Sequence, residues 1–465
     1  MNVPNRKCTN KEINRNRARV YACTSILLLA VGCGKSQGHT NASSVDENEP
    51  SSRPTLSDMM KVTSPGYVTP AGVSQECFGR IIFDGASKIE WPTFYEGDSE
   101  YLFYRSFSPK VADRGDEMKF GNTKIAVLGT ATTATTEEVL KGFPSRQILM
   151  LQSELKDSVV YLEKLKTRKT KSAQELYEIQ FAERSVKALQ GGIKKVTDEF
   201  EAFDPGLADS HGYWYGDLKA ADETDRYSVY RAYLVRASHI FVFESRQQVA
   251  NPAGRIAHKE QFVKLLKKFR VRAPNEIPQE LGVCLPHGFI PDDGKSVIEF
   301  KQSMRYADTP GVVYTLETGN VDARHLKSPE VVAVQKASIG MPGSGGEELE
   351  AKDFVTQRIG PRFAKIGGLG AEQGGVALTV KRPGKEPYEV YTIFTGYSGW
   401  LGTAVLPYIS VDMHTYSKEQ APELKENPPT FKVTLDRLNL LLKSIRLRPT
   451  NPPMPDFATA KGARS

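Results

Sequence analysis

The sequence has few cysteines and histidines and no long hydrophobic run. Its 465 residues include 5 cysteines and 7 histidines, without a Cys-x-x-Cys pair, a Cys/His cluster or an HExxH motif. A structural zinc site is therefore not expected, because such sites take closely spaced Cys and His ligands. The uncharged stretch near the N-terminus, residues 20–32, is shorter than the roughly 20 apolar residues that a membrane-spanning helix needs.

Motifs for nucleotide binding and nucleophilic catalysis are also missing. The glycine-rich stretches 340–348 and 367–375 lack the Lys-Ser or Lys-Thr of a phosphate-binding loop. Residues 396–399 lack the spacing of a nucleophile elbow. Asp209, Ser210 and His211 are neighbours in the chain, whereas a catalytic triad is assembled in space. We therefore expect no catalytic, cofactor-binding or metal-binding residues, and no enzymatic activity.

The positive charge of the chain is concentrated at its N-terminus. The formal net charge is +7, and residues 1–32 contain six basic side chains and one acidic one. Residues 33–465 then hold 56 basic and 54 acidic side chains and are almost neutral. A nucleic-acid partner is not expected, because its phosphates would require a basic surface.

The N-terminus has the features of an export signal. Basic residues up to Arg19 precede the uncharged stretch, which ends in Leu-Leu-Leu-Ala-Val-Gly-Cys at Cys33. This order is typical of a bacterial signal peptide with a lipobox, in which the cysteine receives lipid and the bond before it is cleaved. We expect residues 1–32 to be a signal peptide and Cys33 to be the lipid attachment site. A secreted protein whose signal happens to contain a cysteine is the alternative.

The residues after Cys33 bear on the location of the protein. Gly34 occupies the position where an aspartate typically retains lipoproteins at the inner membrane. Gly34 therefore favours an outer-membrane anchor that faces the periplasm. Residues 33–68 are predicted to be a flexible tether, because they are rich in Ser, Asn, Glu and Pro and have few apolar side chains to bury.

The folded part follows one order of motifs twice. The first copy opens with a strand-like run at residues 76–83 and closes with a helix-like run and Arg-x-Arg at 258–274. The second opens at 281–284 and closes in the same way at 435–449. Alternating runs between these ends favour antiparallel strands. The sequence predicts an α+β protein of two related domains with flanking helices, at residues 69–277 and 278–450, followed by a disordered tail at 451–465.

Residues 145–203 interrupt the strand pattern of the first domain. Apolar residues follow helical spacing on both sides of a basic turn, and Ser172 with Glu175 matches a capping box. We expect a helical hairpin insertion here. Its apolar stripes fit packing against its own domain, or an arm that holds a partner.

Two sets of residues leave alternatives open. Cys77 and Cys284 form a disulfide in an oxidising compartment, or each is a buried free cysteine. Aromatic residues beside glycines form the second set, and they are contacts for a partner protein or packing at strand ends. This set is Tyr213, Trp214, Tyr397 and Trp400.

Four short motifs in order resemble a known family. They are residues 76–80, residues 281–284 with 288–290, the segment from Phe394 to Met413, and residues 444–449. The set resembles the periplasmic immunity proteins that neutralise type VI secretion lipase effectors, the class-four lipase-immunity family. The resemblance implies two domains, frequent lipidation, no catalytic residues and a clamp on the cognate phospholipase.

The function expected from the sequence is therefore inhibition of a toxic enzyme. We expect a periplasmic lipid-anchored immunity protein that binds a cognate secreted lipase and blocks it sterically, with no cofactor and no small-molecule substrate. The alternatives are a non-enzymatic envelope interaction lipoprotein and a lipoprotein hydrolase.

Overall fold

The structure of the protein is a computed structural model in which part of the chain is described. The described residues are 66–91, 117–130, 151–167, 172–199, 201–216, 227–249, 251–321, 354–381, 383–384, 386–400, 402–418, 421 and 424–455. The predicted signal peptide, Cys33 and most of the predicted tether and tail lie outside these residues. Within them, no helix has the length and apolar character needed to cross a membrane.

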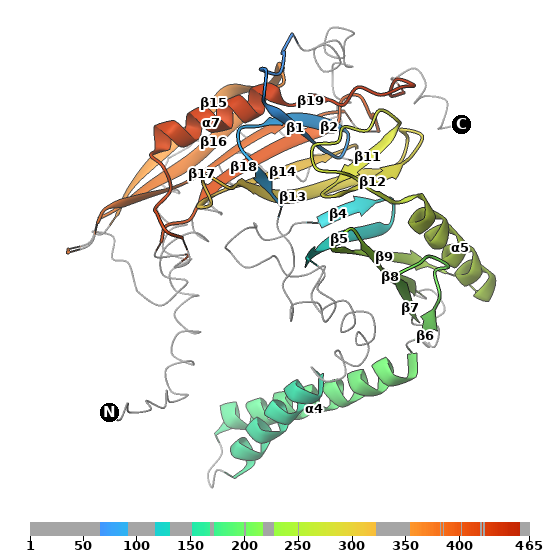
Figure 1. The fold of residues 1–465 in the computed structure, drawn as a ribbon. Coiled ribbons are helices and arrows are strands. Elements are labelled where there is room, and N and C mark those ends of the chain that lie inside the picture. The colour runs from blue at the N-terminus through green and yellow to red at the C-terminus, as the bar shows by residue number, and fades with distance from the viewer. Residues whose placement is uncertain are drawn as a thin grey trace, which may run out of the picture. The chain divides into compact units, whose positions relative to one another are not determined.

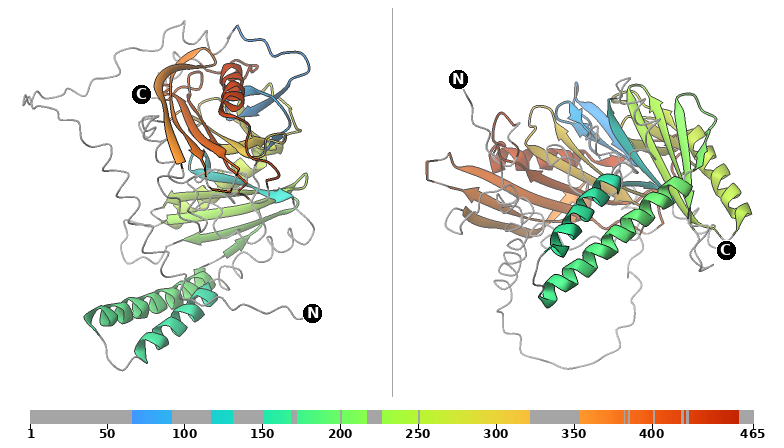
Figure 2. Two further views of the ribbon diagram at one scale, coloured as in Figure 1. Left: turned by 90° about the vertical axis from the view of Figure 1, so that its left-hand side faces the viewer. Right: turned by 90° about the horizontal axis from the view of Figure 1, so that it is seen from below.

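A sheet of 13 antiparallel strands forms the main element of the fold (Figures 1 and 2). Its order is β15-β16-β17-β18-β14-β13-β4-β5-β9-β8-β7-β6, and β3 also pairs with β13. The strands from the first half of the chain are β3 (Ile89–Glu90), β4 (Glu117–Phe120), β5 (Thr123–Thr130), β6 (Glu201–Phe203), β7 (Ser210–Gly216), β8 (Tyr227–Arg236) and β9 (His239–Gln248). Those from the second half are β13 (Ile298–Tyr306), β14 (Val312–Gly319), β15 (Phe354–Ile366), β16 (Leu369–Val380), β17 (Tyr388–Tyr397) and β18 (Tyr408–Thr415).

The two halves of the chain meet in this sheet where β4 pairs with β13. Phe120 lies opposite Ile298, and Met118 lies opposite Phe300. Met118, Ile298 and Phe300 are buried in one hydrophobic core that draws on both halves. The antiparallel sheets and flanking helices confirm the predicted α+β class. The domain boundary at 277/278 stays a prediction, and the halves that it separates share a sheet.

Two smaller sheets join the ends of each half to the other half. One contains β1 (Ser74–Phe78), β2 (Ile81–Gly85) and β19 (Arg446–Leu447), and the other contains β11 (Gly282–Leu285), β12 (Gly288–Pro291) and β10 (Arg270–Val271). In both, a hairpin that opens one half pairs with the Arg-x-Arg strand that closes the other half. We call these two sheets the seam. Their equivalent arrangement supports the predicted repeat.

Equivalent hydrogen bonds fix the closing strands. The backbone N–H of Arg272 donates to the carbonyl of His287 at 3.0 Å, and that of Arg448 donates to the carbonyl of Arg80 at 2.9 Å. His287 and Arg80 lie in the turns of the two opening hairpins. In both small sheets, the second arginine of Arg-x-Arg therefore donates its backbone N–H to the carbonyl of a residue in the hairpin turn.

Buried ion pairs cross the seam. Arg272 pairs with Glu76 at 2.5 Å, and Arg80 pairs with Asp292 at 2.9 Å, with all four side chains less than 10% exposed. Burial favours the neutral form of Arg80 and lowers its pKa, against the opposing effect of Asp292. Arg448 donates to the carbonyls of Glu280 at 2.8 Å and Gly282 at 2.6 Å. Since buried charges are costly without partners, these arginines hold the halves in one arrangement.

A disulfide joins the two opening hairpins. Cys77 and Cys284 are bonded, with their Cα atoms 5.7 Å apart, and both are fully buried. Gly79 and Cys284 also exchange two backbone hydrogen bonds, at 2.9 and 2.8 Å. The bridge left open by the sequence is thus present in the structure.

A helix precedes each closing strand. Helix α5 (Pro252–Lys268) begins at the cap Asn251, whose side chain accepts from the N–H of Gly254, and Pro252 occupies its first turn. Helix α7 (Phe431–Ser444) follows Thr430 and buries Leu438, Leu441 and Leu442.

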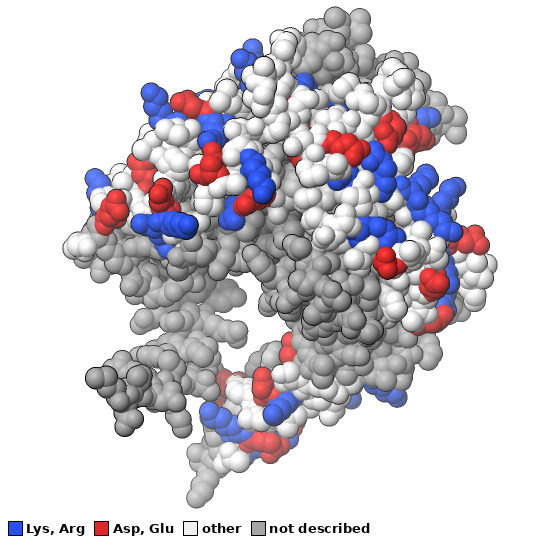
Figure 3. Space-filling view, viewed as in Figure 1, with Lys and Arg blue, Asp and Glu red and all other residues white. Residues whose placement is uncertain are grey.

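Basic and acidic side chains are interspersed on the face of the molecule that Figure 3 shows. This mixture agrees with the near-neutral charge of residues 33–465.

The structure confirms the predicted helical hairpin over its described residues. Helical residues 151–166 and helix α4 (Ala173–Glu199) pack through Leu162, Leu165 and Ile179. Ser172 and Glu175 form the predicted capping box, in which the N–H of each residue donates to the side chain of the other. Tyr177 and Phe181, one turn apart on α4, remain 63% and 60% exposed.

We predict that Arg272→Met lowers the free energy of unfolding by about 3–5 kcal/mol, because it leaves Glu76 buried without its cation. Arg270→Met is the matched control, since Arg270 lies two residues earlier and its salt bridges are partly exposed. The control should cost about 1 kcal/mol or less. Urea unfolding of both variants under oxidising conditions measures the difference, and equal losses would contradict the buried pair's role.

Candidate interaction surface

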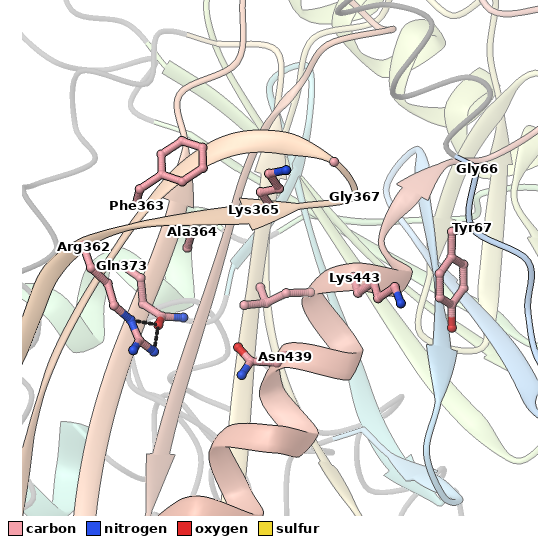
Figure 4. A pocket seen from close by; sticks show the side chains of 12 residues that line it. Gly66, Tyr67, Arg362, Phe363, Ala364, Lys365, Gly367, Gln373, Asn439 and Lys443 are labelled. Carbon is pink, nitrogen blue, oxygen red and sulfur yellow. Dashed lines mark hydrogen bonds between the residues drawn. The ribbon is translucent and has the colours of Figure 1, made fainter.

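A pocket lies between the end of β15 and the second half of α7 (Figure 4). Its volume is about 810 Å³, within the range of ligand sites. The lining residues are Gly66, Tyr67, Arg362, Phe363, Ala364, Lys365, Gly367, Gly368, Gln373, Asn439, Leu442 and Lys443. The pocket thus combines an edge of the main sheet, a helix and the segment that leads into β1.

The turn between β15 and β16 is fixed to the helix. The N–H of Gly367 donates to the carbonyl of Leu442 at 2.9 Å, which satisfies one of the last carbonyls of α7. Gly367 has φ of +55°, and a Cβ there would lie 2.0 Å from the carbonyl oxygen of Ile445. Only glycine fits this close approach, so the sequence itself sets the distance between strand and helix.

The amphipathic pattern of α7 decides which side chains reach the pocket. Leu438, Leu441 and Leu442 are buried, whereas Asn439 and Lys443 are exposed on the other side of the helix. Figure 4 shows Asn439 and Lys443 on the helix, with β15 on one side and Tyr67 on the other. The helix therefore contributes one amide and one cation to the pocket, together with the buried Leu442.

Cations dominate the charged groups of the pocket. Arg362 donates from Nε to Oε1 of Gln373 at 2.8 Å, and the buried Gln373 donates in turn to Thr395. Lys365 and Lys443 have no ion-pair or hydrogen-bond partner among the described residues, and no Asp or Glu lines the pocket. The pocket therefore offers two available ammonium groups to an anionic group.

Tyr67 forms a fixed wall of the pocket. Its hydroxyl donates to Oδ2 of Asp84 at 2.8 Å, and the Arg446 guanidinium lies 5.4 Å from its ring centre. Burial, together with the neighbouring Asp84 carboxylate, raises the pKa of Tyr67 to about 12. The tyrosine thus stays neutral at physiological pH.

The outer side of β15 carries unpaired backbone groups. β15 ends the sheet order, so one of its sides has no partner strand in the described part of the chain. Ile366 and Leu369 flank a two-residue turn and form the closing pair of the hairpin. Because hydrogen-bonded pairs alternate in an antiparallel ladder, Phe363 and Lys365 direct their N–H and C=O groups away from β16.

The structure packs two of the predicted contact aromatics into the fold. Tyr213 and Trp214 on β7 are 6% and 7% exposed. The indole N–H of Trp214 donates to Ser228 at 2.9 Å, and Arg255 stacks on its ring. Because both side chains are buried, they have little surface left to contact a partner protein. They pack within the fold at the strand, which is the alternative that the sequence left open.

Tyr397 and Trp400 are half-buried beside a small core cluster that includes Leu369, Val405 and Leu406. Their predicted role as effector contacts stays a prediction. The predicted lipid site Cys33 lies outside the described residues, and Cys77 and Cys284 form the disulfide of the seam. No group of three His, Cys, Asp or Glu side chains in the described residues is arranged to hold a metal ion.

Sequence reasoning missed the pocket between β15 and α7. The available signal was the period of two along a strand, which places Phe363 and Lys365 on one face. The partner residues on α7 lie some 75 positions later in the chain. Their approach to the strand depends on the seam, which no local pattern reveals.

Comparison with known proteins gives a family for the second half of the chain. Residues 276–450 match the family of the Tle cognate immunity protein 4 C-terminal domain. The match confirms, for this part of the chain, the resemblance predicted from the sequence. No relative among curated proteins matches the chain.

Some solved structures also resemble the chain. The apo structure of the immunity protein TplEi of the T6SS from Pseudomonas aeruginosa is 17% identical, with a TM-score of 0.43, and the match covers 82% of this chain and 98% of that one. The Tle4-Tli4 complex contains a chain with 17% identity, a TM-score of 0.44, and coverage of 82% and 100%. The proposal below rests on the family match and on the chain's own residues.

We predict that Gly367→Ala destabilises the protein more than Gly368→Ala. Both glycines have positive φ, but a Cβ at Gly368 meets nothing within 4 Å. Gly368→Ala should cost about 1–2 kcal/mol for its left-handed backbone alone, and Gly367→Ala should cost more and expose its own amide to hydrogen exchange. Thermal unfolding and amide exchange measure this. Equal effects of the two substitutions would contradict the close packing of turn and helix.

Proposed function

We propose that this chain is an immunity protein that binds a cognate type VI secreted lipase effector and blocks it. The observation that carries the proposal is the match of residues 276–450 to the Tle cognate immunity protein 4 family. Inhibition by occupation requires a complementary surface and a rigid shape, and it needs no chemistry from the inhibitor. We therefore propose that the protein is not an enzyme.

The scaffold suits such a role. The shared sheet, the buried ion pairs and the disulfide hold both halves together, so that little ordering entropy is lost on binding. A specific complex of this kind buries on the order of 1,600 Å² of surface. Discrimination among lipases comes from shape and from mismatched charges that reject other enzymes.

The proposed location is the periplasm, with a lipid anchor in the outer membrane. The signal-like residues 1–32, the lipobox cysteine Cys33 and Gly34 support this proposal. The disulfide between Cys77 and Cys284 is compatible with an exported protein, because disulfides persist in oxidising compartments. The tether would then let the folded part meet an effector that arrives at the membrane.

We predict that the chain from residue 34 onward abolishes ester hydrolysis by its cognate type VI secreted lipase, at a molar ratio of one to one. The reason is that each inhibitor molecule inactivates one enzyme molecule when the steric complex is tight. The measurement is a titration of hydrolysis rate against added protein. A lipase from an unrelated system is the control and should keep its activity.

Two outcomes would contradict the proposal in different ways. Full hydrolysis at molar excess of the chain would exclude inhibition and favour the envelope interaction lipoprotein. Ester hydrolysis by the chain alone would exclude a purely inhibitory protein and favour the hydrolase.

We predict that Cys33→Ser releases the protein from membranes into the soluble periplasm, because the lipid would have no attachment site. Cys23→Ser is the matched control, since Cys23 lies in the same uncharged stretch and would be removed with the signal. Fractionation and mass spectrometry of the wild type should find a lipid-modified N-terminal Cys33. An intact peptide that spans Gly32 and Cys33 would contradict this prediction.

A further inference from the structure

The exposed side of β15 can accept one more strand over a short stretch. Phe363 and Lys365 each point one N–H and one C=O outward, and none of these groups has a partner among the described residues. The available stretch runs from Arg362 to Ile366, because Pro361 has no N–H and Gly367 donates to α7. Five residues of strand extend over about 17 Å.

The charged residues that line the pocket beside this stretch are all basic. Lys365 projects from β15 and Lys443 from α7, and none of the residues that line the pocket is acidic. The nearest acids in register and sequence are Glu372, opposite Phe363 on β16, and Asp436, two turns before Lys443. Neither acid lines the pocket, so the two ammonium groups attract an anion.

An exposed aromatic side chain adds an apolar contact. Phe363 is 72% exposed although it lies in the middle of the stretch. In strand addition, backbone hydrogen bonds give affinity, and contacts with alternate side chains give specificity. Phe363 and Lys365 lie on the same face of β15. Their side chains would therefore contact alternate residues of an added strand.

We infer that an extended acidic segment of the lipase effector adds to the outer side of β15. Its backbone pairs with Phe363 and Lys365, its carboxylates lie at Lys365 and Lys443, and an apolar side chain covers Phe363. This inference rests on the proposed function, because it takes the effector as the partner. It goes beyond it by naming the docking element and the chemistry of the segment that docks.

The charge test uses the double variant Lys365→Glu/Lys443→Glu in the chain from residue 34 onward. The matched control is Lys264→Glu/Lys267→Glu on α5, where Lys267 is the repeat equivalent of Lys443 relative to the closing Arg-x-Arg. Binding of the purified lipase should weaken about tenfold or more in the pocket variant, mainly through slower association and with a smaller salt dependence. The control should bind like the wild type.

The backbone test compares Lys365→Pro with Lys365→Ala. Both remove the charge, but only proline also removes the outward N–H, and residue 365 does not bond to β16. The proline variant should bind more weakly than the alanine variant. As a test without substitution, the amides of Phe363 and Lys365 in the wild type should exchange more slowly once the lipase is bound.

The outcomes separate this inference from the proposed function. If the wild type inhibits the lipase but the pocket variant binds unchanged and exchange at β15 is unaltered, the inference is wrong and the immunity function stands. If the wild type does not bind the lipase, both fail. A third outcome is that the chain binds vesicles of anionic phosphatidylglycerol, that only the pocket variant loses this binding, and that lipase binding is unchanged. The pocket would then bind a lipid surface and not a protein segment, and the inference would be overturned.

Discussion

The crossed pairing at the seam is the constraint on which the rest of the structure depends. Each half of the chain ends in an Arg-x-Arg strand that completes the opening hairpin of the other half. The pairs of Arg272 with Glu76 and of Arg80 with Asp292 are buried there, so neither half can satisfy its charges alone. The seam also explains why Cys77 and Cys284 can be equivalent and still bonded. Equivalent residues of a repeat meet where the two copies face each other across their contact.

The seam positions the elements that form the pocket. Helix α7 leads directly into β19, so the pairing of β19 with β2 sets where the helix ends. Gly367 then bonds to the last turn of the helix and brings the tip of β15 to it. Arg446 of β19 contacts Asp84 and Thr69. Asp84 in turn accepts a hydrogen bond from Tyr67, which lines the opposite side of the pocket. A surface far from the disulfide in sequence thus depends on contacts that begin at the seam.

Local sequence patterns predicted local structure and left the pairing open. The hairpin helices follow from the periodicity of their apolar residues. The capping box follows from the spacing of Ser172 and Glu175. The repeat was visible in the two Arg-x-Arg endings, but the same pattern suits pairing within a half or across halves. Tyr213 and Trp214 fit both a contact surface and a buried strand, because an aromatic residue beside glycine has no local mark of burial. The pocket requires β15 and α7 together, so its charge pattern is absent from any single window of the sequence.

The features that protect the edge of β15 also select what can pair with it. A long unpaired edge invites association with a second copy, and natural proteins counter this with charge, proline and bulges. β15 has all three, with a bulge between Ile359 and Arg362 that contains Pro361, and with Arg362 and Lys365 beyond it. A second copy of the same edge would bring like charges together, whereas an acidic segment would neutralise them. One set of residues therefore discourages self-association and favours a partner of opposite charge.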